Sequence, residues 1–179
     1  MSGRELLRRL IVDEFDIGEP HFTTVKYEKP CAAANDRVVS VSFSHTSESV
    51  AAMVSDDWVV GIDMERSERH VNSRLAKRMQ HNDESFKLYE NNPIIKIWTM
   101  KEAALKAIGT GLRKPMNSVS IRQETEHDFS VRLFDDVFGK ICSFRIENQW
   151  ISVCYIQPEL TLSFLSEAYV PIQTGRNSK

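Results

Sequence analysis

Two short segments of the sequence carry carboxylates and an amine at spacings that suit metal and phosphate binding. Asp63 and Glu65 stand two residues apart at the end of an apolar run that begins at Trp58. Glu102 and Lys106 stand four residues apart in a segment predicted to be helical, so their side chains share one face. A set of carboxylate oxygens is what Mg²⁺ prefers when it also holds substrate phosphates. The residues therefore outline a site for a divalent metal and a pyrophosphate group.

Each of these pairs also has a simpler interpretation. Asp63 and Glu65 could form a solvated strand end, and Glu102 with Lys106 could be a surface ion pair worth only about 0.3–0.5 kcal/mol. Two features favour a site. The strand before Asp63 reads as buried, and Trp98 lies one helical turn before Glu102, where a large aromatic indicates a partly buried face.

Two further segments have open interpretations. Ser44 and His45 end a strand predicted over residues 38–44. A histidine at a strand end is more often structural than functional, but the polar turn at residues 46–49 could present imidazole and hydroxyl groups to an anion. The segment at residues 109–111, Gly-Thr-Gly, resembles a phosphate loop only faintly, and a helix C-cap explains it better.

The composition limits the kinds of function. A chain of 179 residues can bury one sizeable core or two small lobes, and its apolar fraction of 41% is typical of a soluble globular protein. The formal net charge of -2 argues against general nucleic-acid binding. No apolar run approaches the roughly 18 residues of a membrane span. The three cysteines lack zinc-ligand spacing, which predicts reduced thiols in a cytoplasmic protein.

The predicted elements follow one another in an α+β order. Helical spacing predicts helices at residues 4–15, 71–79, 82–91 and 93–108. Alternation and short apolar runs predict strands at residues 38–44, 50–54, 58–63, 118–123, 129–134, 141–146 and 150–156. The helix ending at residue 108 is expected to begin with Asn92 as N-cap and Pro93 as its first residue. Residues 16–37 and 64–71 are expected to be irregular. This order of one helix, then strands, then helices, then strands predicts an α+β fold with two lobes.

Taken together, these segments resemble the 4'-phosphopantetheinyl transferase superfamily. Its hallmark is Gly-(Ile/Val)-Asp, followed some dozens of residues later by Trp/Phe-Ser/Thr/Cys-x-Lys-Glu-Ala/Ser-x-x-Lys. Gly61-Ile62-Asp63 and residues 98–106 match both parts. Residues 41–45 resemble the family's Ile-Ser-His-Ser strand end. Tyr27-Glu28-Lys29-Pro30 resembles its Tyr-Gly-Lys-Pro loop, with glutamate where glycine is usual. The resemblance spans about residues 5–160.

The length of chain before Gly61 makes the sequence similar to the larger, surfactin-synthetase-activating type of this superfamily. That resemblance implies two similar α/β lobes with antiparallel sheets, related by a pseudo-twofold axis, with coenzyme A in the cleft between them. The expected division is a partial N-terminal lobe at residues 1–60, a C-terminal lobe with metal site and catalytic helix at 61–172, and a disordered tail at 173–179. That type usually has a further N-terminal stretch with basic residues near the nucleotide. We therefore expect an incomplete first lobe and a weakened adenosine side of the site.

The resemblance implies an enzyme that moves the 4'-phosphopantetheine arm of coenzyme A onto a serine of an apo acyl or peptidyl carrier protein. Adenosine 3',5'-bisphosphate would be released. Mg²⁺ would be required, with Mn²⁺ able to substitute, and coenzyme A would be the co-substrate. The carrier could belong to fatty acid, polyketide or nonribosomal peptide biosynthesis. No nucleic-acid or membrane partner is expected, and the sequence does not fix the oligomeric state.

The site residues that the resemblance implies fall into three overlapping groups. They are catalytic Glu102, Lys106 and His45; coenzyme A-binding Lys29, Ser44, His45 and Lys106; and metal-binding Asp63, Glu65 and Glu102. Glu102 is the candidate base for the carrier serine. Lys106 and His45 would add positive charge and hydrogen bonds to the phosphate oxygens. Lys101, beside Glu102, is expected to point away from the site, so that its replacement by alanine should reduce activity much less than the replacement of Glu102 by glutamine.

Two alternatives stay open. One is a catalytically weak paralogue that binds carrier proteins without modifying them, because it holds coenzyme A poorly. The other is a Mg²⁺-dependent phosphodiesterase or nuclease that uses the same carboxylates. The near-neutral charge and the lack of a basic stripe count against the second.

Overall fold

The computed structural model describes most of the chain. The described residues are 2–16, 18–23, 29–34, 37–134 and 136–158. Tyr27 and Glu28 of the predicted coenzyme A loop, and the expected disordered tail at 173–179, lie outside them. No helix within the described ranges is long and apolar enough to cross a membrane.

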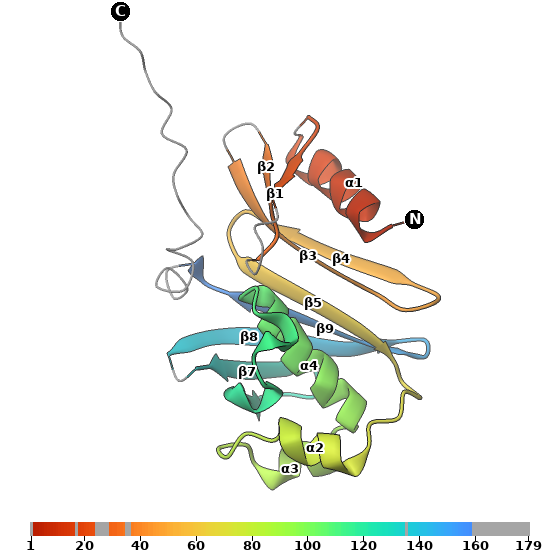
Figure 1. Cartoon of the computed structure of the whole chain (residues 1–179), viewed down its shortest axis with the longest axis vertical. Helices are drawn as coiled ribbons and strands as arrows, with labels where there is room; N and C mark the ends of the chain where they lie inside the picture. Colours follow the sequence, from red (N-terminus) through yellow and green to blue (C-terminus); the bar gives the residue numbers. More distant parts are fainter. Residues whose placement is uncertain (1, 17, 24–28, 35–36, 135, 159–179) are drawn as a thin grey trace, which may run out of the picture.

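The first half of the described chain forms a four-stranded antiparallel sheet. Its strands, in spatial order, are β1 (His21–Thr23), β2 (Cys31–Ala34), β3 (Arg37–His45) and β4 (Val50–Ser55). Helix α1 (Gly3–Phe15) packs on β3 and β4 (Figure 1) and buries Leu7 and Ile11 against Val39 and Val41. The predicted helix and strands here are confirmed. The expectation that residues 16–37 are irregular is wrong, because pairing with β3 makes the short Cys-Ala-Ala-Ala segment a strand without any alternating pattern.

The second half forms a five-stranded antiparallel sheet. Its strands, in spatial order, are β5 (Val59–Arg66), β9 (Gln149–Ile156), β8 (Val137–Ile146), β7 (Asp128–Leu133) and β6 (Val119–Gln123). The other elements are α2 (Ser73–Met79), α3 (Phe86–Asn91), α4 (Ile94–Ala107) and the 3-10 turns η1 (Gly111–Arg113) and η2 (Met116–Ser118). The α+β class with two antiparallel sheets is confirmed. The division at residue 60 stays a prediction, although the first sheet ends at Ser55 and the second begins at Val59.

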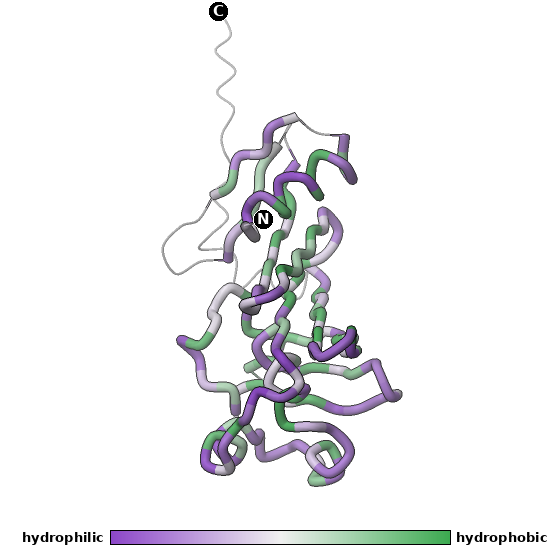
Figure 2. The backbone as a smooth tube through the Cα atoms, turned by 90° about the vertical axis from the view of Figure 1, so that its right-hand side faces the viewer, coloured by the Kyte–Doolittle hydropathy of each residue, from purple (hydrophilic) through white to green (hydrophobic). Residues whose placement is uncertain are grey.

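Helix α4 lies across one face of the second sheet and supplies a large share of its core (Figure 1). Ile97, Met100, Ala104 and Leu105 are fully buried there. Hydrophobic residues concentrate along the strands and hydrophilic residues at the connecting loops (Figure 2). Asn92 is not the N-cap that the sequence predicts. It ends α3 and donates its side-chain amide to the Leu88 carbonyl, so that α4 begins directly after Pro93.

Side-chain hydroxyl groups join the two sheets. Every second residue of β3 is a serine here, and each hydroxyl accepts a hydrogen bond from a backbone N–H of β5. The pairs are Ser40 with Val60 at 3.0 Å, Ser42 with Ile62 at 3.0 Å and Ser44 with Met64 at 3.2 Å. The predicted strands at 50–54 and 58–63 are therefore not a paired hairpin, since β4 and β5 belong to different sheets. This seam carries β5, and the acidic residues on it, to the boundary of the two sheets.

Strand β5 also extends further than predicted. It continues to Arg66 because β9 pairs with it along this whole length. Asp63 lies opposite Ser152, and Glu65 lies opposite Trp150. Both carboxylates therefore stand on regular strand backbone instead of beginning a loop.

Gly61 allows α4 to approach β5 closely, and replacing it should be costly. A Cβ at this position would lie 2.1 Å from the Ala103 carbonyl oxygen and 2.5 Å from the Ala107 nitrogen. Both atoms are backbone, so no rotamer change relieves the clash. We expect Gly61→Ala to lower the free energy of unfolding by about 1–3 kcal/mol or more, measured by urea denaturation. Gly18→Ala is the control, because nothing lies within 4 Å of its Cβ position. Equal effects at the two glycines would contradict this close packing.

Candidate functional site

Asp63 lies on β5 beneath α4, with one carboxylate oxygen satisfied and the other not. Its Oδ1 accepts a hydrogen bond from Lys106 Nζ at 2.7 Å and one from Ser44 Oγ at 3.0 Å. The residue is only 4% exposed, and no donor among the described residues reaches its buried Oδ2. Burial raises the pKa of Asp63, while Lys106 and Ser44 act to lower it. A buried carboxylate oxygen without a donor calls for a bound water or cation.

Glu102 belongs to the same electrostatic cluster. It lies one turn before Lys106 on α4, as the sequence predicts. Burial, together with the negative charge of Asp63, raises the pKa of Glu102 to about 7, while Lys106 and Arg69 oppose the rise. Two carboxylates that raise each other's cost of ionisation are stabilised by a cation between them.

Glu65 is engaged differently. Its Oε1 forms an ion pair with Nη1 of Arg69, and the guanidinium carbon of Arg69 lies 5.0 Å from the centroid of the Trp98 ring. Among the described residues, no group of three or more His, Cys, Asp or Glu side chains is placed to hold a metal ion. The structure thus couples Asp63 to Glu102 but does not assemble the predicted three-carboxylate set, because Arg69 holds Glu65.

Arg69 is the site residue that the sequence reasoning missed. It stands in the charged segment at residues 64–71, which was expected to be an irregular loop. A cation four residues after Glu65 is a weak signal in such a segment. Only the approach of this turn to Trp98 on α4 shows that the arginine belongs to the site.

Ser44 and His45 diverge at the end of β3. Ser44 is buried and donates to Asp63, which places it in the site. His45 is exposed, and because neighbouring strand residues point to opposite faces, its side chain leaves the strand on the other side from Ser44. The structure does not bring His45 to the carboxylates, and its role toward coenzyme A stays a prediction.

Lys29 lies at the seam and ties three elements together. Its Nζ donates to the carbonyl oxygens of Val41 on β3 at 3.3 Å, of Lys106 on α4 at 3.4 Å, and of Val60 on β5. Burial lowers the pKa of Lys29 to about 7, although three carbonyl acceptors match the three hydrogens of its ammonium form. A phosphate contact for Lys29 stays a prediction, and it would require the amine to leave at least one of these carbonyls.

Lys101 points away from the site, as expected, but it is far from an idle surface residue. Its side chain is fully buried, lies 2.7 Å from a Glu84 carboxylate oxygen, and donates to the carbonyls of Met79 and Val119 at 2.6 and 2.7 Å. A smaller loss of activity for Lys101→Ala than for Glu102→Gln stays a prediction, but the substitution should also cost stability, because removing the amine would leave a buried carboxylate without its ion-pair partner.

A pocket of about 290 Å³ opens beside Lys106, between the first sheet and the end of α4. Its lining residues are Pro30, Val41, Ser42, Phe43, Lys106, Gly109, Gly111 and Arg113. A larger hollow of about 780 Å³ lies between α3 and the edge of the second sheet, and none of the predicted site residues lines it. Lys106 and Arg113 line the smaller pocket, so it adjoins the candidate site, although Asp63, Glu65 and Glu102 are not among its lining residues.

Comparison with known proteins agrees with this arrangement. The family model described as the 4'-phosphopantetheinyl transferase superfamily matches residues 59–154, more than half of the chain. The chain is 30% identical over 126 residues to the 4'-phosphopantetheinyl transferase gsp of Aneurinibacillus migulanus, covering 66% of this chain and 51% of that protein. It is 28% identical over 143 residues to the 4'-phosphopantetheinyl transferase Sfp of Bacillus subtilis (strain 168), covering 75% and 62%. The chain thus spans between half and two thirds of these relatives. It belongs to the 4'-phosphopantetheinyl transferase superfamily.

Proposed function

We propose that this chain transfers the 4'-phosphopantetheine arm of coenzyme A to a serine of an apo acyl or peptidyl carrier protein, with the help of a divalent metal. The serine oxygen forms a bond to the β-phosphorus, the pyrophosphate P–O bond breaks, and adenosine 3',5'-bisphosphate leaves. The observation that carries the proposal is the buried Oδ2 of Asp63, which no donor within the described part of the chain reaches and which lies in a charged cluster with Glu102 and Lys106. Its relatives are named for this transfer.

The residues present fit a divalent cation. No donor among the described residues reaches Oδ2 of Asp63. Burial, together with the negative charge of Asp63, raises the pKa of Glu102, and a cation would offset this cost of ionisation. Asp63 and Glu102 would hold the metal, with Glu65 joining once Arg69 releases it. Carboxylate oxygens favour Mg²⁺, with Mn²⁺ as a substitute, over softer ions. When bound, the metal would neutralise the pyrophosphate and polarise its phosphoryl oxygens.

The side chains of the chain itself supply the remaining chemistry. Glu102 takes the proton of the carrier serine hydroxyl as the general base. Lys106 holds Asp63 and borders the pocket, so its ammonium group can donate to a phosphate oxygen there. Ser44 fixes the orientation of Asp63. Lys29 and His45, at the seam and at the end of β3, are the proposed contacts to the nucleotide.

Incubation with coenzyme A, Mg²⁺ and a panel of apo carrier proteins, followed by intact-mass measurement, tests the proposal. We expect one phosphopantetheine on the carrier serine, no transfer in excess EDTA, recovery with Mg²⁺, and poor substitution by Zn²⁺. Full transfer in EDTA would contradict the metal site. Coenzyme A cleavage without carrier modification would identify a phosphodiesterase instead. Carrier binding without measurable coenzyme A affinity in calorimetry would identify a non-catalytic paralogue.

A further inference from the structure

We infer that Arg69 is a built-in counter-ion of the carboxylate site, which competes with the divalent metal for Glu65. The inference rests on the metal site of the proposed function and adds a residue that sets how tightly that site takes its metal. Arg69 pairs with Glu65 Oε1, its guanidinium stacks 5.0 Å from the Trp98 ring centroid, and its positive charge lowers the pKa of Glu102. The ion pair with Glu65 and the contact with the Trp98 ring therefore place this cation among the predicted ligands.

The position of Arg69 explains how the carboxylates coexist without a metal. Lys106 compensates Asp63 directly, and Arg69 compensates Glu65 while also acting on Glu102. A divalent cation that used the Glu65 carboxylate would meet Arg69 as a competitor for the same group. When only a fraction of the protein is in the state that can bind the metal, the apparent affinity falls to that fraction of its intrinsic value.

The surroundings of Arg69 leave it able to move away. The side chain is 45% exposed, so its ion pair is solvated and contributes little net stability. A hollow of about 240 Å³ lies beside it, lined by Thr46, Ser47, Glu65, Arg66, Glu68 and Arg69. Metal binding therefore needs only a reorientation of one partly exposed side chain, which stays near the site and able to contact an anion.

A titration of the full chain with Mn²⁺, without coenzyme A, tests this competition. The electron paramagnetic resonance signal of free Mn²⁺ measures how much of the metal is bound. Arg69→Gln keeps much of the side chain's length but removes its charge. If Arg69 occupies Glu65 for two thirds to nine tenths of the time, the variant should bind Mn²⁺ about three- to tenfold more tightly. Unchanged or weaker binding would overturn the inference, since it would mean that Arg69 is indifferent to the metal or helps to position Glu65.

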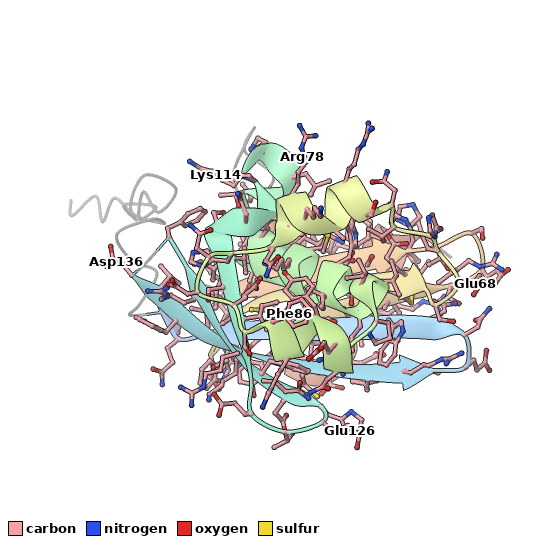
Figure 3. The ribbon with its side chains drawn as sticks, turned by 90° about the horizontal axis from the view of Figure 1, so that it is seen from below. Glu68, Arg78, Phe86, Lys114, Glu126 and Asp136 are labelled. Carbon is pink, nitrogen blue, oxygen red and sulfur yellow. The ribbon has the colours of Figure 1, made fainter. Side chains whose placement is uncertain are left out.

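Arg66→Gln is the matched control, because it removes the same charge from the same hollow. Arg66 pairs with Glu48 and Glu68, and Glu68 projects outward at the rim of the molecule (Figure 3). We expect Arg66→Gln to change the Mn²⁺ affinity by less than about twofold. If both substitutions increased Mn²⁺ affinity equally, the increase would follow from net charge alone, and the inference would be overturned.

A double-mutant cycle completes the test. If Arg69 and the metal compete for Glu65, Arg69→Gln should lose most of its effect in a Glu65→Gln background, and only the part that acts through the charge of Glu102 should remain. The same gain in both backgrounds would contradict competition at Glu65. If neither the wild type nor Arg69→Gln binds Mn²⁺, the metal site of the proposed function fails together with the inference. If the wild type binds but Arg69→Gln binds equally well, only the inference fails. Circular dichroism confirms that each variant is folded.

Discussion

Replacing Glu102 by glutamine should reduce transfer by more than the roughly 10²–10⁴-fold that follows removal of a general base alone. The same carboxylate is the proposed base and a proposed metal ligand, so glutamine removes both functions while keeping the size of the side chain. Initial rates with coenzyme A, Mg²⁺ and an apo carrier protein measure the loss. Glu126→Gln, on an exposed turn at the far rim (Figure 3), is the control and should retain wild-type rates.

The same substitution should have the opposite effect on stability, which separates lost chemistry from lost folding. Burial and Asp63 raise the pKa of Glu102 from 4.5 to about 7. Between these values the native state binds a proton that the unfolded state has released, so stability is lost as pH rises toward 7. Glutamine cannot ionise and escapes this loss. In EDTA at pH 8, Glu102→Gln should therefore unfold at a higher urea concentration than the wild type.

Two results would contradict these roles of Glu102. Transfer within about tenfold of the wild type would show that another group takes the serine proton. A variant that is less stable than the wild type at pH 8 in EDTA would show that the Glu102 charge is compensated in the native state.

Replacing Lys101 by methionine should destabilise the fold by about 3–5 kcal/mol, the range for breaking a buried ion pair. Lys101 and Glu84 are both fully buried and lie 2.7 Å apart. Burial lowers the pKa of Lys101, while the charge of Glu84 and its hydrogen bond to Lys101 oppose this. Methionine preserves volume but removes the cation beside the buried carboxylate, which keeps its hydrogen bonds from Tyr89, His81 and Ile121 but loses its countercharge. Urea denaturation measures the loss.

Two controls distinguish the buried pair from a general packing effect. Glu84→Gln combined with Lys101→Met removes both charges and should recover part of the lost stability, since the amide can still accept a hydrogen bond from the Ile121 N–H. The second control is Lys106→Met, which replaces a partly exposed lysine on the same helix. It should reduce transfer strongly, and it should cost less stability than Lys101→Met, because Ser44 still donates to the Asp63 carboxylate. A Lys101→Met variant as stable as the wild type would rule out the buried pair as a structural element.

Local patterns in the sequence were enough to predict the features that lie within a single helix or strand. The periodic apolar residues of α4 gave its position almost to the residue, and this periodicity also placed Glu102 and Lys106 on one face. The glycine-isoleucine-aspartate strand and the tryptophan-lysine-glutamate helix were sufficient to indicate the family. These properties depend on residues within one element, and a side chain's neighbours within its own element follow from helix or strand geometry.

Tertiary structure alone decided which groups meet across elements. Arg69 reaches Glu65 and Trp98 because the turn after β5 folds back toward α4, and nothing in its local sequence requires this. Lys101 and Glu102 are adjacent in sequence, yet one is buried against Glu84 and the other faces Asp63. The compensation of a charge depends on distance, burial and the partner that packing supplies. Helical periodicity could therefore predict that these two side chains diverge, but not what either of them would meet.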